Sequence, residues 1–328
     1  MIISRTPLRV SFVGGGTDLR AYYSHRPGAV VSMAIDKYVY ITVNDLSPLF
    51  GAKIILKYAR TERVNTLDEV EHTIIKAALR RLNIKSVEIT SMADIPAGTG
   101  MGSSSSFAVG LLNALYAYKG QYRSGEELAR EACEIEIKTL REPIGKQDQY
   151  IAAYGGLQYI QFNPDETVFV DPILCNERVK KQMMDHLLLL YTGVRGPASD
   201  VLTQQRQNIQ QDEEKRRYLT NMVHLTRELR EELSRNRIGS FGEILHQNWL
   251  LKQRLADGVT SPQIDAWYEA ARQHGAEGGK ILGAGGGGFL LFWAPKERHK
   301  EICAALPELQ PARIDLEPQG SKIIYIGG

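Results

Sequence analysis

The sequence predicts a mixed α/β fold, and two patterns support this. Short runs rich in Val, Ile and Tyr, typical of strands, alternate along the chain with longer stretches that are apolar at helical spacing. Turn-forming residues cluster at 165–176 and separate two halves of similar length. Because 328 residues suffice for one large or two ordinary domains, we expect an N-terminal domain over residues 1–170 and a C-terminal domain over residues 171–328.

The first half begins with strands and a glycine turn. A strand over Arg9–Val13 runs into three glycines, and the turn places Thr17 and Asp18 just past the strand end, where loops commonly carry function. The alternative is a glycine hairpin with a surface aspartate. The next predicted elements are paired strands over Val30–Asp36 and Val39–Asn44 with a turn at Asp36 and Lys37, a strand over Lys53–Tyr58, and helices opened by capping boxes at Thr66 and Ser124 that end at about Leu82 and Leu140.

The stretch from Pro96 to Ser106 has the composition of a phosphate-binding loop. Three glycines precede four serines, and the uncharged run Phe107–Tyr118 then predicts a buried helix. Such a loop presents the unpaired N–H groups of a helix N-terminus to a phosphate. The serine hydroxyls could reach a phosphate oxygen or the metal ion that accompanies it. The alternative is a flexible Gly/Ser connection between a strand and a helix.

Two familiar phosphate loops do not fit this stretch. A P-loop requires Lys and then Ser or Thr after its last glycine, and no lysine lies between Asp94 and Lys119. The pair Gly98 and Gly100 resembles the start of a dinucleotide fingerprint, but the third glycine of that fingerprint is misplaced here. A phosphate site in this stretch would therefore belong to another class of loop.

Two carboxylates in the following segment are candidate functional groups. Glu136 falls in the apolar row of the helix that Ser124 opens, so it is either a member of a buried ion pair or a magnesium ligand, and the helix alone favours the ion pair. Asp148 follows a Pro/Gly turn and could accept a proton from a hydroxyl or orient that hydroxyl. The alternative for Asp148 is an ordinary helix N-cap. Lys146, two residues before Asp148, could favour the charged form of that carboxylate.

The second half is predicted to contain a buried strand, several helices and a second glycine motif. The strand Leu187–Tyr191 leads into a turn that ends at Arg195. The run Gly283–Gly288 allows close approach of the backbone to a ligand or to the other domain. The predicted helices are Glu213–Ser234, one capped by Ser240 that ends at about Leu255, and one opened by Ser261 and Pro262 that stops at Gly275.

Composition narrows the function classes. The 40 Lys and Arg side chains nearly balance the 38 Asp and Glu, which argues against a protein that coats nucleic acid or binds membranes through a polybasic surface. No apolar run could span a bilayer and the N-terminus lacks a signal-peptide pattern, so we expect a cytoplasmic protein without nucleic-acid or membrane partners. Three widely spaced cysteines fit reduced thiols. The sequence makes no prediction of the oligomeric state.

Three motifs, in this order, resemble those of the GHMP kinases, the superfamily of galactokinase, homoserine kinase, mevalonate kinase and phosphomevalonate kinase. The motifs lie at Pro7–Asp18, Pro96–Ser106 and Gly283–Gly288, and they span nearly the whole chain. Serines at positions 105 and 106 replace the commoner alanines. The resemblance implies a two-domain α/β fold with ATP and magnesium in the cleft between the domains. It also implies a left-handed βαβ connection around the phosphate loop, contrary to the usual handedness.

The resemblance also implies roles for individual residues. Asp148 matches the catalytic aspartate, and Arg9 matches the basic residue that faces the reacting hydroxyl. Ser104 and Glu136 match magnesium ligands. Glu136 stands twelve residues before Asp148, as the metal-binding carboxylate does in galactokinase. The resemblance therefore favours the magnesium ligand over the ion pair for Glu136. The implied nucleotide contacts are Pro96, Gly98, Gly100, Met101, Gly102, Ser103, Ser104 and Ser105, and the implied substrate contacts are Gly15, Gly16, Thr17, Asp18, Lys146, Arg195, Gly285 and Gly286.

Within the superfamily, the motifs are most similar to those of the heptose kinases. The matching stretches are Ser4–Phe12, Gly14–Asp18 and Gly145–Gly156. This resemblance implies ATP-dependent phosphorylation of the anomeric hydroxyl of D-glycero-D-manno-heptose 7-phosphate, a step that would feed nucleotide-activated heptose for bacterial surface polysaccharide. A fucokinase, a galactokinase or another sugar kinase of the superfamily stays open. A non-catalytic sugar sensor would be expected to have lost one of four residues that are all present, Arg9, Ser104, Glu136 and Asp148.

Overall fold

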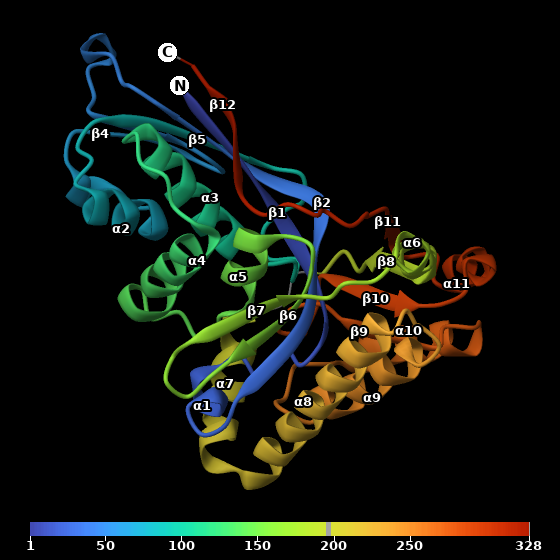
Figure 1. Ribbon diagram of the computed structural model, residues 1–328. Helices are drawn as coiled ribbons and strands as arrows, with labels where there is room; N and C mark the ends of the chain where they lie inside the picture. Colours follow the sequence, from blue (N-terminus) through green and yellow to red (C-terminus); the bar gives the residue numbers. More distant parts are fainter. Residues whose placement is uncertain (195–197, 328) are drawn as a thin grey trace.

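The computed structural model describes residues 1–194 and 198–327, which form two β-sheets with helices packed around them (Figure 1). The predicted contact Arg195 lies outside the described residues. Eight strands form the first sheet in the order β12-β1-β2-β5-β3-β4, with β6 joined to β2 and β7 to β6, and four form the second in the order β11-β8-β10-β9. The strands are β1 (Ile2–Val13), β2 (Gly28–Asn44), β3 (Ile54–Lys57), β4 (Thr61–Val64), β5 (Val87–Ala93), β6 (Leu157–Phe162), β7 (Val168–Pro172), β8 (Leu187–Tyr191), β9 (Gly278–Ile281), β10 (Phe289–Trp293), β11 (Gln310–Ala312) and β12 (Lys322–Ile326).

Helices complete the mixed α/β architecture that the sequence predicts. None of the described helices combines the length and the apolar character needed to cross a membrane. The α-helices are α1 (Arg20–Tyr23), α2 (Thr73–Leu82), α3 (Ser103–Tyr118), α4 (Gly125–Cys133), α5 (Gln147–Tyr154), α6 (Glu177–His186), α7 (Ala198–Gln211), α8 (Glu213–Ser234), α9 (Phe241–Gln253), α10 (Pro262–Gln273) and α11 (His299–Ala305), and the short segments are η1 (Pro48–Phe50), η2 (Leu67–Glu69), the π-helical η3 (Glu134–Thr139) and η4 (Lys296–Arg298).

The predicted hairpin at Asp36 and Lys37 is wrong. Both residues lie inside β2, which continues without a turn because β1 pairs with both of its halves. The register of this pairing shifts between Pro7 and Leu8 of β1, so Asp36 and Lys37 are the extra residues of a bulge. Turn-forming residues therefore mark a kink in one long strand.

The predicted start of α4 is confirmed, as are two helices of the second half. Ser124 accepts a hydrogen bond from the backbone N–H of Glu127, and the Glu127 side chain completes the capping box. The hydroxyl of Ser261 caps α10, with proline at the first helical position. Helix α8 has the predicted bounds. Local capping chemistry thus determines these helix ends.

Two other helix predictions are wrong in detail. Thr66 opens only the single turn η2, because the chain becomes extended again before α2, which begins at Thr73 with His72 as its cap. The helix predicted to end at about Leu140 is regular only as far as Cys133 and then continues as the π-helical segment η3. This change of helix type bears on the site, because π-helical turns are frequent where a side chain has a function.

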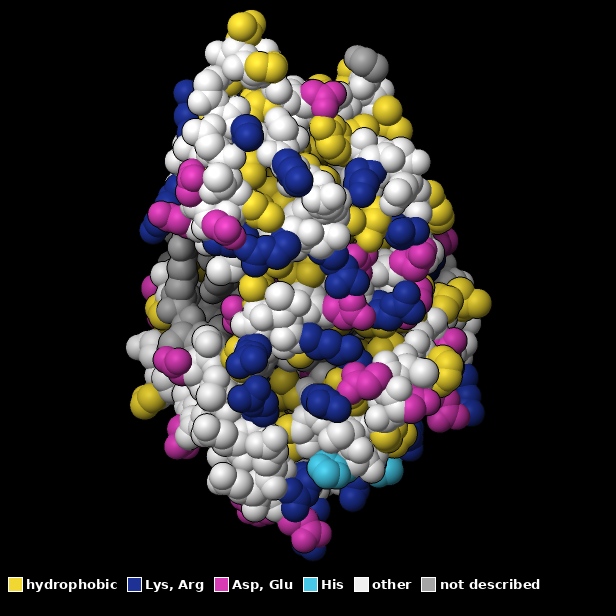
Figure 2. Space-filling view, turned by 90° about the vertical axis from the view of Figure 1, so that its left-hand side faces the viewer, with side chains coloured by type: hydrophobic (Ala, Val, Ile, Leu, Met, Phe, Trp, Pro, Cys, Tyr) yellow, Lys and Arg dark blue, Asp and Glu magenta, His cyan; other side chains and the backbone are white. Residues whose placement is uncertain are grey.

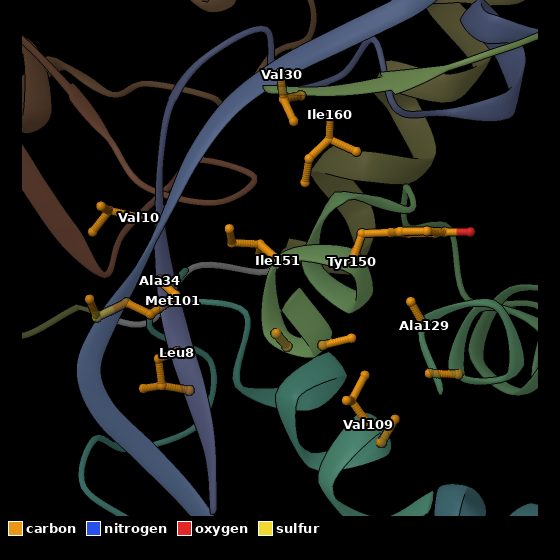
Figure 3. Close-up of a cluster of buried hydrophobic side chains, with 14 of the residues drawn as sticks. Leu8, Val10, Val30, Ala34, Met101, Val109, Ala129, Tyr150, Ile151 and Ile160 are labelled. Carbon is orange, nitrogen blue, oxygen red and sulfur yellow. The ribbon is translucent and has the colours of Figure 1, made fainter. Parts of the chain in front are cut away.

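Helix α3 is buried, as its uncharged sequence predicts. It packs against β1, β2, α4 and α5. Side chains from these elements, such as Leu8 of β1, Val30 of β2, Val109 of α3 and Ile151 of α5, form one hydrophobic cluster (Figure 3). Met101, an implied nucleotide contact, belongs to the same cluster, with 1% of its surface exposed. Its side chain therefore stabilises the core beneath the glycine loop.

The end of the chain returns to the first sheet. Strand β12 pairs antiparallel with β1, and the two chain ends lie side by side (Figure 1). The backbone N–H of Gly327 donates to the carbonyl of Met1 at 2.8 Å. A domain boundary at residue 170 stays a prediction, and β12 belongs to the sheet of the first half.

Two glycine-rich loops, one from each sheet, pack against each other. A Cβ atom added to Gly283, in the β9–β10 connection, would lie 2.6 Å from the Cα atom of Gly100, which precedes α3. A Cβ atom on Gly288 would overlap the backbone of Thr99. Glycine is needed at these positions because any side chain would separate the loops. The sequence allows the run Gly283–Gly288 to approach either a ligand or the other domain, and the structure shows close approach to another part of the chain.

Replacement of Gly283 by alanine should destabilise the protein more than the same change at Gly51. Both glycines have positive φ, 76° and 68°, so alanine costs about 1–2 kcal/mol at either. Gly51 has open space around it, whereas at Gly283 the contact with Gly100 adds an overpacking cost of about 1–3 kcal/mol. Urea unfolding of the wild type, Gly51→Ala and Gly283→Ala measures the difference, and equal losses would contradict the close packing of the loops.

Candidate active site

A cavity of about 280 Å³ lies where β1, the glycine loop before α3 and the start of α5 converge. Its walls include residues from both halves of the chain. The candidate site residues that line it are Arg9, Gly15, Gly16, Asp18, Gly98, Gly100, Gly102, Ser103, Ser104, Ser105, Glu136 and Asp148. The fold thus brings together the residues for which the sequence implies catalytic and metal-binding roles, with most of the implied nucleotide contacts.

Arg9 and Asp148 form a two-point ion pair in this cavity. Arg9 lies on β1 and donates from Nε to Oδ1 of Asp148 at 2.7 Å and from Nη2 to Oδ2 at 2.8 Å. Its Nη1 donates to the carbonyl of Gly100 at 2.6 Å. The Arg9 side chain is 4% exposed and that of Asp148 22%. The arginine therefore fixes the orientation of a carboxylate that stays accessible to a ligand.

The glycine loop has the conformation that its composition predicts. Gly98, Gly100 and Gly102 have φ values of 78°, 80° and 75°, in the left-handed region that favours glycine. Gly102 is the N-cap of α3 and forms no side-chain cap. The N–H groups of the first turn therefore have no partner within the helix, and the positive end of the helix dipole lies beside them. This helix start can accept a phosphate.

Glu136 is buried beside the first turn of α3. Ser104 Oγ donates to its Oε1 at 2.9 Å, and Gln149 Nε2 donates to its Oε2 at 2.7 Å. Burial raises the pKa of Glu136 to about 7; hydrogen bonds from Gln149 and two serines oppose this effect, and the charge of Asp148 adds to it. In the described part of the chain no Lys or Arg pairs with Glu136, so the ion-pair interpretation finds no support there.

The donor set around Glu136 fits magnesium. The described residues include no group of three or more His, Cys, Asp or Glu side chains able to hold a metal ion. Magnesium is nevertheless commonly bound by one or two protein oxygens, with water and substrate phosphates as its remaining ligands. Glu136 is buried beside the hydroxyl of Ser104 and forms no ion pair within the described residues, which matches this pattern.

Asp18 is oriented by main-chain N–H groups. Gly16 donates to its Oδ1 at 2.9 Å and Gln147 to its Oδ2 at 3.3 Å. Burial raises the pKa of Asp18, and the hydrogen bond from Gly16 opposes this effect. Gly145 packs directly against the carboxylate, leaving no room for a Cβ atom. Because an ionised carboxylate can accept about four hydrogen bonds, Asp18 keeps acceptor capacity for a ligand.

Lys252 also lines the cavity, and the sequence analysis does not predict it. Its Nζ donates to the carbonyl of Gly15 at 3.3 Å and to Oε1 of Gln205 at 3.1 Å. Burial lowers the pKa of Lys252 to about 8, although the negative charge of Asp18 acts in the opposite direction. The sequence feature that could have indicated Lys252 is the position of this lysine in the buried row of α9, three residues after Trp249.

Several implied contacts lie away from this cavity. The Thr17 hydroxyl lies 2.8 Å from the carbonyl oxygens of both Gly14 and Ala29, so its donor is used within the turn itself. Gly285 packs against the backbone of Val259. The implied contacts that do not line the cavity are Pro96, Met101, Thr17, Lys146, Gly285 and Gly286. The ligand contacts implied for these residues stay predictions.

Lys146 contacts Glu166, in the β6–β7 turn. Its Nζ lies 2.6 Å from Oε2 of Glu166, 3.2 Å from the carbonyl of the same residue and 4.7 Å from the centroid of the Tyr23 ring. The side chain is 11% exposed. Neither role that the sequence suggests for Lys146 follows from this geometry, since its ammonium group is directed toward another carboxylate.

Stability should depend on pH through the buried Lys280 of β9. Burial, with the charges of Lys252 and Arg9, lowers the pKa of Lys280 to about 7. The unfolded chain then binds more protons between pH 7 and about 10, so the free energy of unfolding should rise with pH in this window. Lys280→Met should reduce this slope by up to about 1 kcal/mol per pH unit.

Urea unfolding at pH 6.5 to 9.5 measures the slope, with the exposed Lys181→Met as the control. An unchanged slope in Lys280→Met would mean that Lys280 stays protonated in the folded protein throughout this range.

Two family models match the chain. The model of the GHMP kinases N terminal domain matches residues 70–156, and that of the GHMP kinases C terminal domain matches residues 229–312. Both parts of one family are therefore present in their expected order, and together they cover more than half of the chain. The matched ranges include α3, η3 and α5 from the site, and the β9–β10 connection that packs on it.

Two relatives and one solved structure show the extent of the similarity. D-glycero-alpha-D-manno-heptose 7-phosphate kinase of Campylobacter jejuni is 27% identical over 320 residues, which are 94% of each chain. The bifunctional fucokinase/GDP-fucose pyrophosphorylase of Arabidopsis thaliana is 27% identical over 92% of this chain but 31% of its own length. The crystal structure of a D-glycero-D-manno-heptose 1-phosphate kinase from Bacteroides thetaiotaomicron covers all of both chains with a TM-score of 0.81 and 24% identity, and shows the same fold.

The matches agree with the site geometry. A phosphate-accepting helix start, an accessible aspartate fixed by arginine, and a buried carboxylate beside a serine hydroxyl are groups that phosphoryl transfer can use. On the two family models and this fold, the chain belongs to the GHMP kinases, phosphotransferases that use ATP as the phosphate donor.

Proposed function

We propose that this kinase transfers the γ-phosphoryl group of ATP to the anomeric hydroxyl of D-glycero-D-manno-heptose 7-phosphate. The observation that carries the proposal is the Arg9–Asp148 pair, which lies in one cavity with Asp18 and the start of α3. The substrate is supported by the Campylobacter jejuni relative, whose name specifies this sugar phosphate and which matches over 94% of the chain. Such an ATP-dependent enzyme would act in the cytoplasm.

On the acceptor side, Asp148 accepts the hydroxyl proton or orients the hydroxyl for attack. The two hydrogen bonds from Arg9 hold the carboxylate in place before substrate binds. The same guanidinium group stabilises negative charge as it develops on the attacking oxygen. Asp18 accepts hydrogen bonds from sugar hydroxyls. Because little covalent chemistry is required of the protein in phosphoryl transfer, this positioning is the main catalytic contribution.

On the donor side, the free N–H groups at the start of α3 bind phosphate oxygens. The glycines at 98, 100 and 102 allow the backbone to approach the triphosphate closely. Ser104 and Glu136 are the residues that would hold magnesium, which supplies positive charge to the phosphates when bound. The hydrogen bond from Gln149 orients the Glu136 carboxylate for this role.

Release of ADP from a panel of acceptors tests the proposal. The highest kcat/KM is expected for D-glycero-D-manno-heptose 7-phosphate, compared with the free heptose, L-fucose, galactose, mevalonate and homoserine. A preference for L-fucose would favour the fucokinase relative as the guide to function. Purified protein that binds ATP but releases no ADP with any sugar or sugar phosphate would overturn a sugar-kinase assignment.

Asp148→Asn should lower kcat by roughly 10²- to 10⁴-fold, the range of general acid–base contributions. Asparagine keeps the size of the side chain but cannot take the hydroxyl proton. Affinity for ATP, measured by calorimetry, should stay near that of the wild type, which also shows that the variant is folded. A variant with wild-type kcat would remove Asp148 from the mechanism.

Glu136→Gln should raise the magnesium concentration for half-maximal activity roughly tenfold or more, the scale on which loss of a metal-site partner acts. Glutamine keeps a hydrogen-bonding oxygen but removes the charge. Glu134→Gln is the matched control, since Glu134 lies in the same π-helical segment and pairs with Arg81. If both variants keep the magnesium dependence of the wild type, Glu136 has a structural role only.

A further inference from the structure

A second and larger cavity, of about 1000 Å³, adjoins the candidate active site. Its walls come from α1, the π-helical segment, the loop 141–146, the β6–β7 turn and α7. Six Lys and Arg side chains line it against three Glu. The face of the molecule that carries α1, α4 and the β6–β7 turn has Lys and Arg side chains gathered around its middle (Figure 2). The cavity therefore has the charge that attracts an anion.

Ion pairs already engage two of the three carboxylates that line this cavity. Glu166 is already paired with Lys146 at 2.6 Å and with Arg20 at 2.9 Å. Glu134 is paired with Arg81 at 2.6 Å, outside the cavity. The lining cations that form no ion pair within the described residues are Arg130, Lys138, Arg141 and Arg206. Four basic side chains thus remain against a single carboxylate, that of Glu142.

The larger cavity shares part of its wall with the smaller one. Asp18 lines the smaller cavity, Arg20 lines the larger, and Leu19 between them lines both. The segment 142–144 also lines both cavities, and Arg141, directly before it, lines the larger. The part of the larger cavity that adjoins Leu19 and Glu142 is therefore the part next to the site of Asp18.

Helix α7 forms a wall common to both cavities. Ser199 and Leu202 line the smaller cavity, and Arg206 and Gln210 line the larger. These four residues are spaced at three and four positions, so they lie on one face of the helix. Arg206 lies about 6 Å along the helix axis from Leu202, at about 1.5 Å per residue. The residues of α7 that line the two cavities are thus about one helical turn apart.

The larger cavity lies on the acceptor side of the site. Among the described residues that line it, none comes from the glycine loop 96–106, whose residues line only the smaller cavity. Asp18 and the arginine-bound Asp148 line the smaller cavity as well. A molecule that extends from these aspartates into the larger cavity therefore moves away from the donor phosphates.

We propose that the larger cavity receives the phosphate that the sugar carries at the end remote from its reacting hydroxyl, with Arg141 and Arg206 as its principal donors. The assignment rests on the proposed function and adds the residues that select a phosphorylated sugar. Arg141 and Arg206 adjoin the two walls that the cavities share, and neither forms an ion pair within the described residues. A guanidinium group can donate two hydrogen bonds to one phosphate, and Arg130 and Lys138 add charge.

The test compares D-glycero-D-manno-heptose 7-phosphate with the unphosphorylated heptose as acceptors. Arg141→Ala and Arg206→Ala should each raise KM for the phosphorylated sugar roughly tenfold to a hundredfold, the range of one charge-assisted contact. The values of kcat, KM for ATP and kcat/KM for the free heptose should stay near wild type. In the double variant, the ratio of kcat/KM for the two sugars should approach one, and Arg206→Lys should restore part of the preference.

Arg217→Ala is the matched control, because this arginine of α8 is 76% exposed and lines neither cavity. Inorganic phosphate should compete with heptose 7-phosphate in the wild type and lose this effect in the double variant. Where alanine also lowers turnover of the free heptose, Arg141→Gln and Arg206→Gln repeat the comparison with side chains of closer length.

The outcomes separate this assignment from the proposed function. A wild-type ratio near one would overturn the sugar-phosphate substrate itself. A high wild-type ratio that persists in the double variant, while the free heptose is used normally, would overturn only the role of Arg141 and Arg206.

Discussion

The ion pair between Arg9 and Asp148 holds the site together. Arg9 extends from a central strand, bonds both oxygens of a carboxylate at the start of α5 and reaches the carbonyl of Gly100 with its third nitrogen. One side chain thus connects the sheet, a helix and the glycine loop. Arg9, whose side chain is 4% exposed, depends on Asp148 for a charged partner. The pair therefore constrains the fold and the position of the reacting groups together.

Buried charges of both signs surround this pair. Lys252 and Lys280 are fully or nearly buried, and burial lowers the pKa of each. Burial also raises the pKa of Asp18 and of Glu136. In each case the main cause is that burial disfavours the charged form. The charged side chains of this site lose their water when the protein folds. A charged ligand can therefore interact with them without a further desolvation cost for these groups, which is the basis of electrostatic preorganisation.

Short-range features of the sequence were sufficient for much of the fold and part of the site. Uncharged residues around the whole circumference of α3 predict a buried helix, and capping side chains set the starts of α4 and α10. The glycines at 98, 100 and 102 adopt the left-handed conformation that only glycine adopts without strain. These predictions succeeded because each depends on steric and hydrogen-bonding rules within a few residues. The hairpin predicted at Asp36 was wrong because the continuity of β2 depends on its pairing with β1, which lies beyond these few residues.

The sequence by itself determined which residue types could act: the glycine loop, its serines, and the acidic side chains at 18, 136 and 148. Only the tertiary structure decided which of them meet. It placed Ser104 against Glu136, directed Lys146 to Glu166 and brought Lys252 of α9 into the cavity. Each of these contacts depends on how distant elements pack. A charged side chain takes the partner that packing leaves within reach, and local sequence does not specify that partner.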